Sequence, residues 1–500
     1  MAQETQSVVA GGAPAGMRAR PVGSGKLTRD ALVAHGVSRR TILRAGTCCL
    51  AVAAAARLTD LMQEPILGTP VAHAQVTRPG AVLFENARIF DGTTSRLLGP
   101  SNVLVRGSVI QTISSTPTAD PADMTVQRIL CGGRTLMPGL IDNHWHTMLA
   151  RISPLELLDA DDIGYANLLA GVEAEATLMR GFTTVRDLGG PSFGLKRSID
   201  EGLARGPRIY PSGAMITTTG GHGDFRSPAE LPRQLGGPLT PMEGMNAALV
   251  TDSPDEVRVR VREQLSRGAS QIKLTAGGGV ASPHSPLDVA TFTEDELRAA
   301  VQAAENWGTY VTVHAYTPIT IQRAISVGIR VIEHGHLMDE ATARLMAEND
   351  VWLSFQPFTD DGYAPPLAPA NMLRLQQVWA GTEQAIAFSK QYSIKMAWGT
   401  DILFTPGGGT RQGFELTKMS QWYEPAEVLR MATSTNAELL KLSGPRDPYP
   451  GKLGVVEQGA LADLLLVNGN PLEDLHLLEA PAQNLVLIMK DGQIHKNTLA

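Results

Sequence analysis

Short apolar runs separated by Gly and Asp occupy residues 81–137 and return near the C-terminus. Ala81-Val82-Leu83-Phe84 and Val109-Ile110-Gln111-Thr112-Ile113 are examples, and 462–467 and 485–489 have the same texture. Runs of this length and composition predict β-strands. Because two β-rich flanks surround a middle of different character, we predict one small β-sandwich domain composed of residues 75–137 plus 443–500.

Between these flanks, residues 138–442 alternate short apolar strands with helical segments. The predicted strands are 183–185, 271–274, 310–313, 330–332 and 395–398. The helices predicted before the last four of these strands are 255–267, 294–307, 319–327 and 372–388. A repeated βα unit of this size predicts an α/β fold with a parallel (β/α)8 TIM barrel.

The first 74 residues have the features of an export signal. Ser38-Arg39-Arg40-Thr41-Ile42-Leu43-Arg44 contains twin arginines, an uncharged Ala-rich run follows at 45–56, and Ala72-His73-Ala74 is a small-x-small cleavage pattern. We therefore predict a twin-arginine signal peptide over 1–74, transport by the twin-arginine export machinery, and a periplasmic or secreted mature protein. The apolar run is too short to span a bilayer, so no stable membrane insertion is expected.

Composition narrows the class of protein further. The chain has a formal net charge of -7 and 43% hydrophobic residues. Because the signal segment is basic, the remainder is more acidic than the whole, which argues against a nucleic-acid partner. Cys131 is the only cysteine after residue 74, so an internal disulfide is excluded in the mature chain.

Most of the candidate metal ligands occur at or just after the C-terminal end of a predicted barrel strand, where barrel enzymes place their active sites, and Lys273 lies within one. Alone, each has an ordinary structural explanation: a strand Lys can lie at the surface, a His can be bonded in the core, and an Asp can cap a helix. Their shared position favours one site for zinc or a similar divalent ion. The candidates are His144, His146, Lys273, His314, His334 and Asp401.

Several segments carry a family resemblance. Leu136-Met137-Pro138-Gly139-Leu140-Ile141-Asp142-Asn143-His144-Trp145-His146 resembles the first-strand block of the amidohydrolase superfamily. Its later blocks are similar to Ile332-Glu333-His334-Gly335, Gly399-Thr400-Asp401, 432–437 and 459–464. The resemblance covers nearly everything after the signal, and it implies a (β/α)8 barrel with a composite β-sandwich.

The resemblance also implies a binuclear metal centre. His144, His146 and Asp401 would hold the more buried ion, and His314 and His334 the second. Lys273 would be carbamylated and bridge both ions, because a carbamate replaces a cation with a bidentate anion. A bridging hydroxide would attack the scissile carbonyl, and Asp401 would carry its proton to the leaving amine.

Two features favour hydrolysis over deamination within this superfamily. The deaminase branch lacks the fourth-strand lysine, which here is Lys273. It also places a Glu shortly after the fifth-strand His, whereas 314–318 contains none. An intact ligand set likewise argues against a non-catalytic relative.

Segments 217–224, 273–280 and 314–316 resemble the prolidase-like, imidazolonepropionase-related branch, which includes Xaa-Pro dipeptidases and ochratoxin-hydrolysing amidases. The implied substrate is an N-acyl amino acid, a dipeptide or an ochratoxin-like amide. A hydrolase of xenobiotic amides, carbamates or ureas is the alternative. Barrels of this kind often associate, so a homo-oligomer is one possible state of the protein.

Three further side chains are candidates for substrate contact. His222 could be a second electrophile at the carbonyl oxygen, or could stabilise its loop. Tyr316 could hydrogen-bond a substrate carboxylate, or pack in the barrel. Arg186 could bind that carboxylate, or form a buried pair with Asp187.

Overall fold

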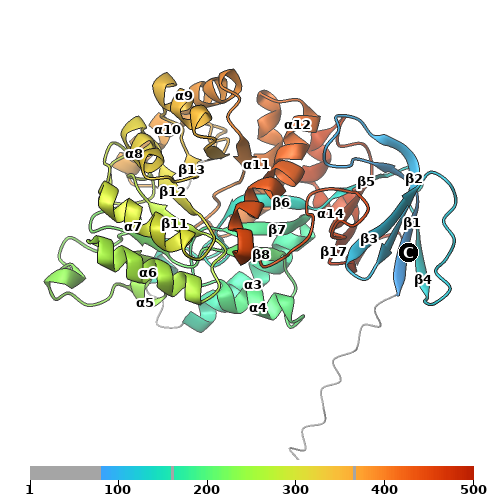
Figure 1. Ribbon diagram of the computed structural model, residues 1–500, viewed down its shortest axis with the longest axis horizontal. Coiled ribbons are helices and arrows are strands. Elements are labelled where there is room, and N and C mark those ends of the chain that lie inside the picture. Colours follow the sequence, from blue (N-terminus) through green and yellow to red (C-terminus); the bar gives the residue numbers. More distant parts are fainter. Residues whose placement is uncertain (1–79, 159–162, 364–366, 500) are drawn as a thin grey trace, which may run out of the picture. The chain divides into compact units, whose positions relative to one another are not determined.

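The computed structural model describes residues 80–158, 163–363 and 367–499 (Figure 1). The predicted export segment, with its twin arginines and its cleavage site after Ala74, lies outside the described residues. Residues Thr77–Ala500 form one compact unit. Among the described helices, none is long and apolar enough to cross a membrane.

Both ends of this unit contribute strands to one eight-stranded sheet, in the order β18-β17-β16-β5-β1-β2-β3, with β4 paired to β1. The two ends meet where β5 pairs antiparallel with β16 and Leu136 lies opposite Leu466. The red C-terminal strands therefore lie beside the blue N-terminal strands in Figure 1. The strands are β1 (Ala81–Ile89), β2 (Leu98–Arg106), β3 (Val109–Ser114), β4 (Val126–Leu130), β5 (Thr135–Pro138), β16 (Leu464–Val467), β17 (Leu485–Lys490) and β18 (Gln493–Asn497).

One apolar cluster holds this sheet together, and it draws on both chain ends. Phe84 and Val103 from the N-terminal strands pack in the same cluster as Leu466 and Leu487 from the C-terminal strands. A sheet assembled from both chain ends is what the sequence pattern predicted. Its arrangement as a two-layered sandwich stays a prediction.

The middle of the chain supplies parallel strands. A three-stranded sheet has the order β6-β7-β8, and a seven-stranded sheet has the order β10-β9-β11-β12-β13-β14-β15. Backbone hydrogen bonds join the two sheets: Ser270 N donates to Pro211 O, and Asp401 N donates to His144 O at 2.8 Å. The strands are β6 (Leu140–Trp145), β7 (Phe182–Asp187), β8 (Arg208–Pro211), β9 (Met215–Thr217), β10 (Ala248–Val250), β11 (Ile272–Thr275), β12 (Val311–Ala315), β13 (Val331–His334), β14 (Trp352–Phe355) and β15 (Met396–Trp398). This is an α/β fold of the TIM-barrel type.

Helices alternate with these strands, and the four predicted helices are present with ends shifted by less than one turn. Apolar faces of α6, α7 and α8 pack in one core cluster with β11 and β12. The helices are α2 (Pro154–Leu158), α3 (Ile163–Met179), α4 (Phe193–Asp200), α5 (Pro241–Gly244), α6 (Pro254–Ser266), α7 (Glu294–Glu305), α8 (Pro318–Ser326), α9 (Glu340–Glu348), α10 (Pro369–Gln391), α11 (Gln412–Thr417), α12 (Pro425–Arg430), α13 (Asn436–Leu440) and α14 (Pro481–Asn484). Short 3₁₀ or π turns are η1 (Arg233–Leu235), η2 (Gly408–Arg411), η3 (Lys418–Gln421), η4 (Met431–Thr435), η5 (Lys441–Arg446) and η6 (Leu475–Glu479).

Local sequence explains where several helices begin. At α7, the Thr293 side chain accepts a hydrogen bond from Glu296 N, and the Glu296 carboxylate accepts one from Thr293 N. This reciprocal capping box satisfies two backbone donors at the helix start and is worth about 1 kcal/mol. At α6 the Ser253 side chain accepts a hydrogen bond from Glu256 N, and Pro254 occupies the first helical position. These caps fix the strand-to-helix turns that surround the site.

Candidate metal centre

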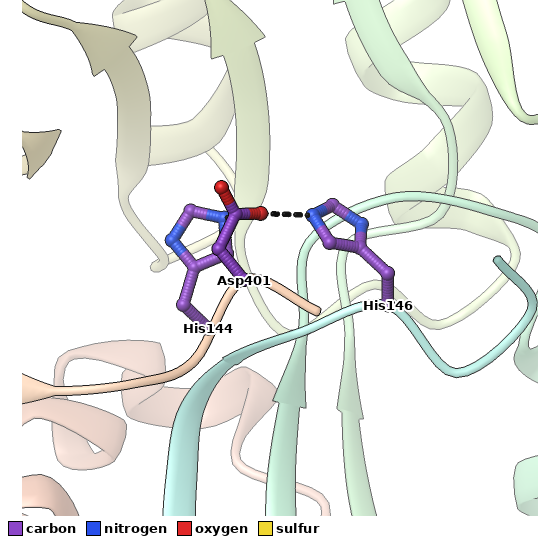
Figure 2. A group of neighbouring side chains, drawn as sticks. All are labelled: His144, His146 and Asp401. Atoms are coloured by element: carbon purple, nitrogen blue, oxygen red, sulfur yellow. Dashed lines mark hydrogen bonds and ion pairs between the residues drawn. The ribbon is translucent and has the colours of Figure 1, made fainter. Parts of the chain in front are cut away.

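Two histidines and an aspartate form a compact cluster where β6 and β15 meet (Figure 2). Asp401 Oδ1 lies 3.0 Å from His146 Nε2 and 3.2 Å from His144 Nε2. Candidate ligand atoms of all three residues lie within 4.8 Å of one another. His144 belongs to β6 itself, His146 follows β6 directly, and Asp401 lies three residues after the end of β15. Two imidazoles and one carboxylate at this spacing can hold a divalent cation.

Lys273, His314 and His334 come from the neighbouring strands β11, β12 and β13 and line the same cavity. The ring centroids of His314 and His334 are 4.3 Å apart, and those of His334 and His144 are 5.0 Å apart. The structure therefore brings together all six side chains that the sequence singled out as metal ligands.

The protonation of these groups suits metal binding. Burial, with the neighbouring charges of His222 and His334, holds the pKa of His314 well below its ordinary value. Burial likewise depresses the pKa of His334. Burial alone would raise the pKa of Asp401, but contact with His144 and His146 outweighs it and holds that pKa well below the usual range. Neutral imidazoles beside an ionised carboxylate are the forms that bind metals.

Unpartnered lone pairs test whether this cluster fits a cation. His334 Nδ1 lies 2.7 Å from Gln356 Oε1, so Nδ1 carries the proton and donates it. His334 Nε2 is then a bare lone pair, and it is buried without a hydrogen-bond partner. A buried acceptor of this kind costs free energy unless something occupies it. The donor set therefore fits a divalent metal.

Lys273 is buried among these residues. Burial lowers the pKa of Lys273 to about 8, against the opposing charges of Glu333 and Asp401. A lysine amine with this pKa is partly neutral at physiological pH, and only the neutral amine is nucleophilic.

Two of the candidate ligands have left-handed backbone conformations. His334 has φ 79° and Asp401 has φ 55°. Non-glycine residues rarely adopt this region, and such strain concentrates at functional sites. His334 is the last residue of β13 and Asp401 lies three residues after β15, and both side chains line the cavity.

His222 and Tyr316 lie on the cavity wall beside the cluster. The His222 ring stacks on His314 with centroids 4.2 Å apart, and its Nδ1 lies 2.7 Å from Ser282 Oγ. Burial lowers the pKa of His222 to about 4, so the ring is neutral at neutral pH. The Tyr316 ring stacks on His334 with centroids 4.8 Å apart. Both side chains can reach a ligand in the cavity.

The interpretation of Arg186 as a carboxylate-binding residue is wrong. Arg186 is fully buried in the barrel interior and does not line the cavity. Its Nη2 lies 2.6 Å from Glu333 Oε1, so its charge is already paired. The alternative pairing with Asp187 is also not observed, because the Asp187 carboxylate accepts Thr147 N and Gly189 N instead.

Other polar residues surround the cluster and were not predicted from the sequence. Asp142 accepts hydrogen bonds from Thr400 N and Thr400 Oγ1, and so ties β6 to the Gly-Thr-Asp turn. Glu333 and Gln356 are fully buried and contact His144 and His334. Asp142 and Glu333 were part of the quoted motifs but received no role. Gln356 follows the apolar strand β14, and a polar residue there is the only signal in the sequence.

The cavity has a volume of about 530 Å³. Much of its wall is apolar or aromatic, including Phe225, Phe358, Trp379, Leu403 and Phe404. Arg411 and Lys418 also line it, but both contact Asp361 and Glu415 within 3.1 Å, which balances their charges.

Comparison with known proteins identifies the class. The amidohydrolase family model matches residues 135–496, and the chain belongs to that family. Ochratoxinase from Aspergillus niger is 29% identical over 382 residues, covering 72% of this chain and 75% of the relative. A solved amidohydrolase is 37% identical with a TM-score of 0.76, and a solved prolidase in complex with N-methylphosphonate-L-proline is 33% identical with a TM-score of 0.76. Each covers 84% of this chain and 100% of the solved chain.

The chain is therefore a hydrolase, and its relatives include the prolidases and ochratoxinase of the branch that its motifs resemble.

Proposed function

We propose that this protein hydrolyses the amide bond of N-acyl amino acids or dipeptides at a two-metal site. The observation that carries the proposal is the convergence of six potential ligands on one cavity. Five different strands bring them together, namely β6, β11, β12, β13 and the end of β15. Support also comes from a prolidase and an ochratoxinase among the relatives.

In this proposal His144, His146 and Asp401 would hold one divalent ion, His314 and His334 would hold a second, and Lys273 would serve as a ligand to both as its carbamate. Zinc suits this set of imidazole and carboxylate donors. When bound, the ions would supply the positive charge that activates water and polarises a carbonyl. The neutral Lys273 amine would add to carbon dioxide and lose a proton, which gives an anionic carbamate.

The protein's own side chains then manage protons and orientation. Asp401 faces the cavity and would take a proton from the attacking water and pass it to the leaving nitrogen. His222 would donate a hydrogen bond from Nε2 to the carbonyl oxygen as negative charge grows there. His222 Nδ1 could accept a hydrogen bond from the Ser282 hydroxyl, and the ring proton of the neutral His222 would then be on Nε2. Tyr316 would hydrogen-bond the substrate carboxylate.

The wall of the cavity supports a second candidate function. Its aromatic side chains suit a bulky apolar group, and its two cations are already paired with carboxylates. Arg411 and Lys418 are therefore not free to pair with a substrate carboxylate. A neutral amide, carbamate or urea needs no such partner. Hydrolysis of such neutral substrates is therefore the alternative.

A mass-spectrometric screen would separate the two candidates. Purified protein, with and without added zinc, would be incubated with N-acyl amino acids, Xaa-Pro dipeptides and their carboxamide counterparts. We expect the free acids to be hydrolysed in preference to the carboxamides. This hydrolysis should be lost in Lys273→Ala and kept in Lys395→Ala, which changes an exposed lysine. Preference for the carboxamide would favour the alternative, and no hydrolysis of any amide would contradict both.

We also propose that the twin-arginine segment exports the protein. The exported protein is expected to begin at Gln75. The double substitution Arg39→Lys, Arg40→Lys is expected to retain the protein in the cytoplasm. N-terminal sequencing of the exported fraction would check this. Export unaffected by the double substitution would contradict it.

A further inference from the structure

Two polar side chains in the barrel interior touch the candidate metal ligands without lining the cavity. Glu333 in β13 and Gln356 just after β14 are both fully buried. Since neither side chain lines the cavity, a ligand in the cavity would not contact them. Their role has to be sought in what they do to the histidines.

Glu333 bridges a histidine and an arginine. Its Oε2 lies 2.8 Å from His144 Nδ1, and its Oε1 lies 2.6 Å from Arg186 Nη2 and also accepts from Thr312 Oγ1. Gln356 Nε2 also lies 3.2 Å from His144 Nδ1. The charged carboxylate at 2.8 Å is the stronger partner and can only accept, so a proton of His144 belongs on Nδ1. The lone pair of His144 is then on Nε2, the atom that faces Asp401.

Gln356 has the same relation to His334. Its Oε1 accepts from His334 Nδ1 at 2.7 Å. The orientation of the amide follows from Ser354 O, to which only the Nε2 end can donate. His334 consequently presents Nε2, which is buried without a partner. The Gln356 backbone carbonyl also accepts from His336 Nε2 at 2.9 Å, which orders the turn after β13.

Arg186 holds the Glu333 carboxylate in place. Besides Glu333, its guanidinium donates to Asn143 O at 2.6 Å, Tyr310 OH at 3.2 Å and Ser354 Oγ at 3.1 Å. Asn143, Glu333 and Ser354 belong to β6, β13 and β14, and Tyr310 directly precedes β12. The guanidinium therefore cannot turn without breaking several bonds. A buried cation and a buried anion that satisfy each other in this way hold a fixed geometry.

We infer that Glu333 and Gln356 are positioning residues that select the ring nitrogen offered by His144 and His334, and that Arg186 holds Glu333 in place. This inference rests on the proposed metal site and assigns a role to residues outside it. Partners of metal-bound histidines fix the tautomer and the ring orientation, and losing one typically lowers metal affinity about 10–100-fold.

Metal affinity of the full chain tests the inference directly. Zinc dissociation constants would be measured by chelator competition for the wild type, Glu333→Gln, Gln356→Leu and Gln264→Leu. Gln264 is the matched control, because it is equally buried and its side chain bonds only the backbone N of Ala214. We expect affinity to fall at least about tenfold in the first two variants and to be unchanged in the control.

Gln356→Glu and the cobalt spectrum separate positioning from general loss of structure. The Glu variant keeps an acceptor oxygen opposite His334 Nδ1, and so should recover most of the wild-type affinity. Cobalt-loaded Gln356→Leu should show a shifted visible absorption band, whereas cobalt-loaded Gln264→Leu should not.

The possible failures are distinguishable. Wild-type affinity in folded Glu333→Gln and Gln356→Leu would overturn the positioning role alone. If Gln356→Leu does not fold, Gln356→Glu decides: affinity as low as in Glu333→Gln would overturn the role of the acceptor. A wild type that binds no zinc would overturn this inference together with the proposed function.

Discussion

Asp401 Oδ1 lies 3.0 Å from Nε2 of His146, although 255 residues separate the two in the sequence. The contact forms at the junction of the first and last barrel strands, where Asp401 N also donates to His144 O. Gly399 is required for this approach, since a Cβ there would lie 2.4 Å from His144 N. The junction of the first and last barrel strands thus brings His144, His146 and Asp401 of the candidate metal centre together.

Asp401→Asn should strongly reduce hydrolysis. The amide is nearly the same size as the carboxylate, but it loses the charge and the ability to take a proton. We expect kcat to fall by about 100-fold or more, the range for removing a general acid–base group. Steady-state kinetics on the substrate found in the screen would measure this. Asp360→Asn, at a nearby exposed carboxylate, should retain wild-type kcat, and equal losses in the two variants would contradict the assignment.

His222→Ala should lower kcat without removing metal. The ring lies on the cavity wall and would stabilise charge on the carbonyl oxygen, and such a donor is worth about 100-fold or more in kcat. Kinetics and elemental analysis of the same preparation would separate the two effects. The control is His284→Ala, at an exposed histidine off the cavity wall. Loss of metal in His222→Ala would show that His222 is a ligand instead.

Gly279→Ala should reproduce the effect of His222→Ala while keeping the histidine. A Cβ at Gly279 would lie 2.1 Å from His222 Nδ1, so the ring must move away from Ser282. Gly277→Ala is the matched control, because a Cβ there meets nothing closer than 3.3 Å. We expect a large drop in kcat for the first variant and little change for the second. Similar kinetics for the two alanine variants would contradict this placement of His222.

Acid should destabilise the eight-stranded sheet through His495 in β18. Burial, with Lys490 and Arg205 nearby, lowers the pKa of His495 from 6.5 to about 4. The folded state therefore binds this proton less readily than the unfolded state. Its contribution to stability is present above pH 6.5 and is lost as the pH falls towards 4.

His495→Gln should therefore flatten the pH dependence of stability. Urea unfolding at pH 7, 6 and 5 would compare it with the wild type and with His284→Gln at an exposed histidine. The free energy of unfolding of the first variant should fall less between pH 7 and 5. Equal slopes in all three proteins would contradict the role of His495.

Much of the fold follows from local sequence. The alternation of short apolar strands and helical segments indicated the α/β middle, and the apolar runs at both ends indicated a shared sheet. Boundaries were less accurate: the strand predicted over 310–313 is β12, which runs from Val311 to Ala315. Backbone pairing with β13 extends the strand there, which composition cannot reveal.

The candidate ligands were predictable because most of them lie at or just after the C-terminal end of a barrel strand, and Lys273 lies within one. Arg186 was misassigned for a related reason. Its strand position places it inside the barrel, but the sequence does not reveal that Glu333, 147 residues later, points at it. Gln356 escaped notice because its importance depends on two histidines from other strands. Partners set by tertiary register leave no local pattern.

The central claim is metal-dependent amide hydrolysis, and the most direct test combines elemental analysis with activity on one preparation. Protein would be assayed as purified, after chelator treatment, and after zinc is restored. The account predicts about two divalent ions per chain, loss of amide hydrolysis with their removal, and recovery on adding zinc. Undiminished hydrolysis by metal-free protein would contradict it.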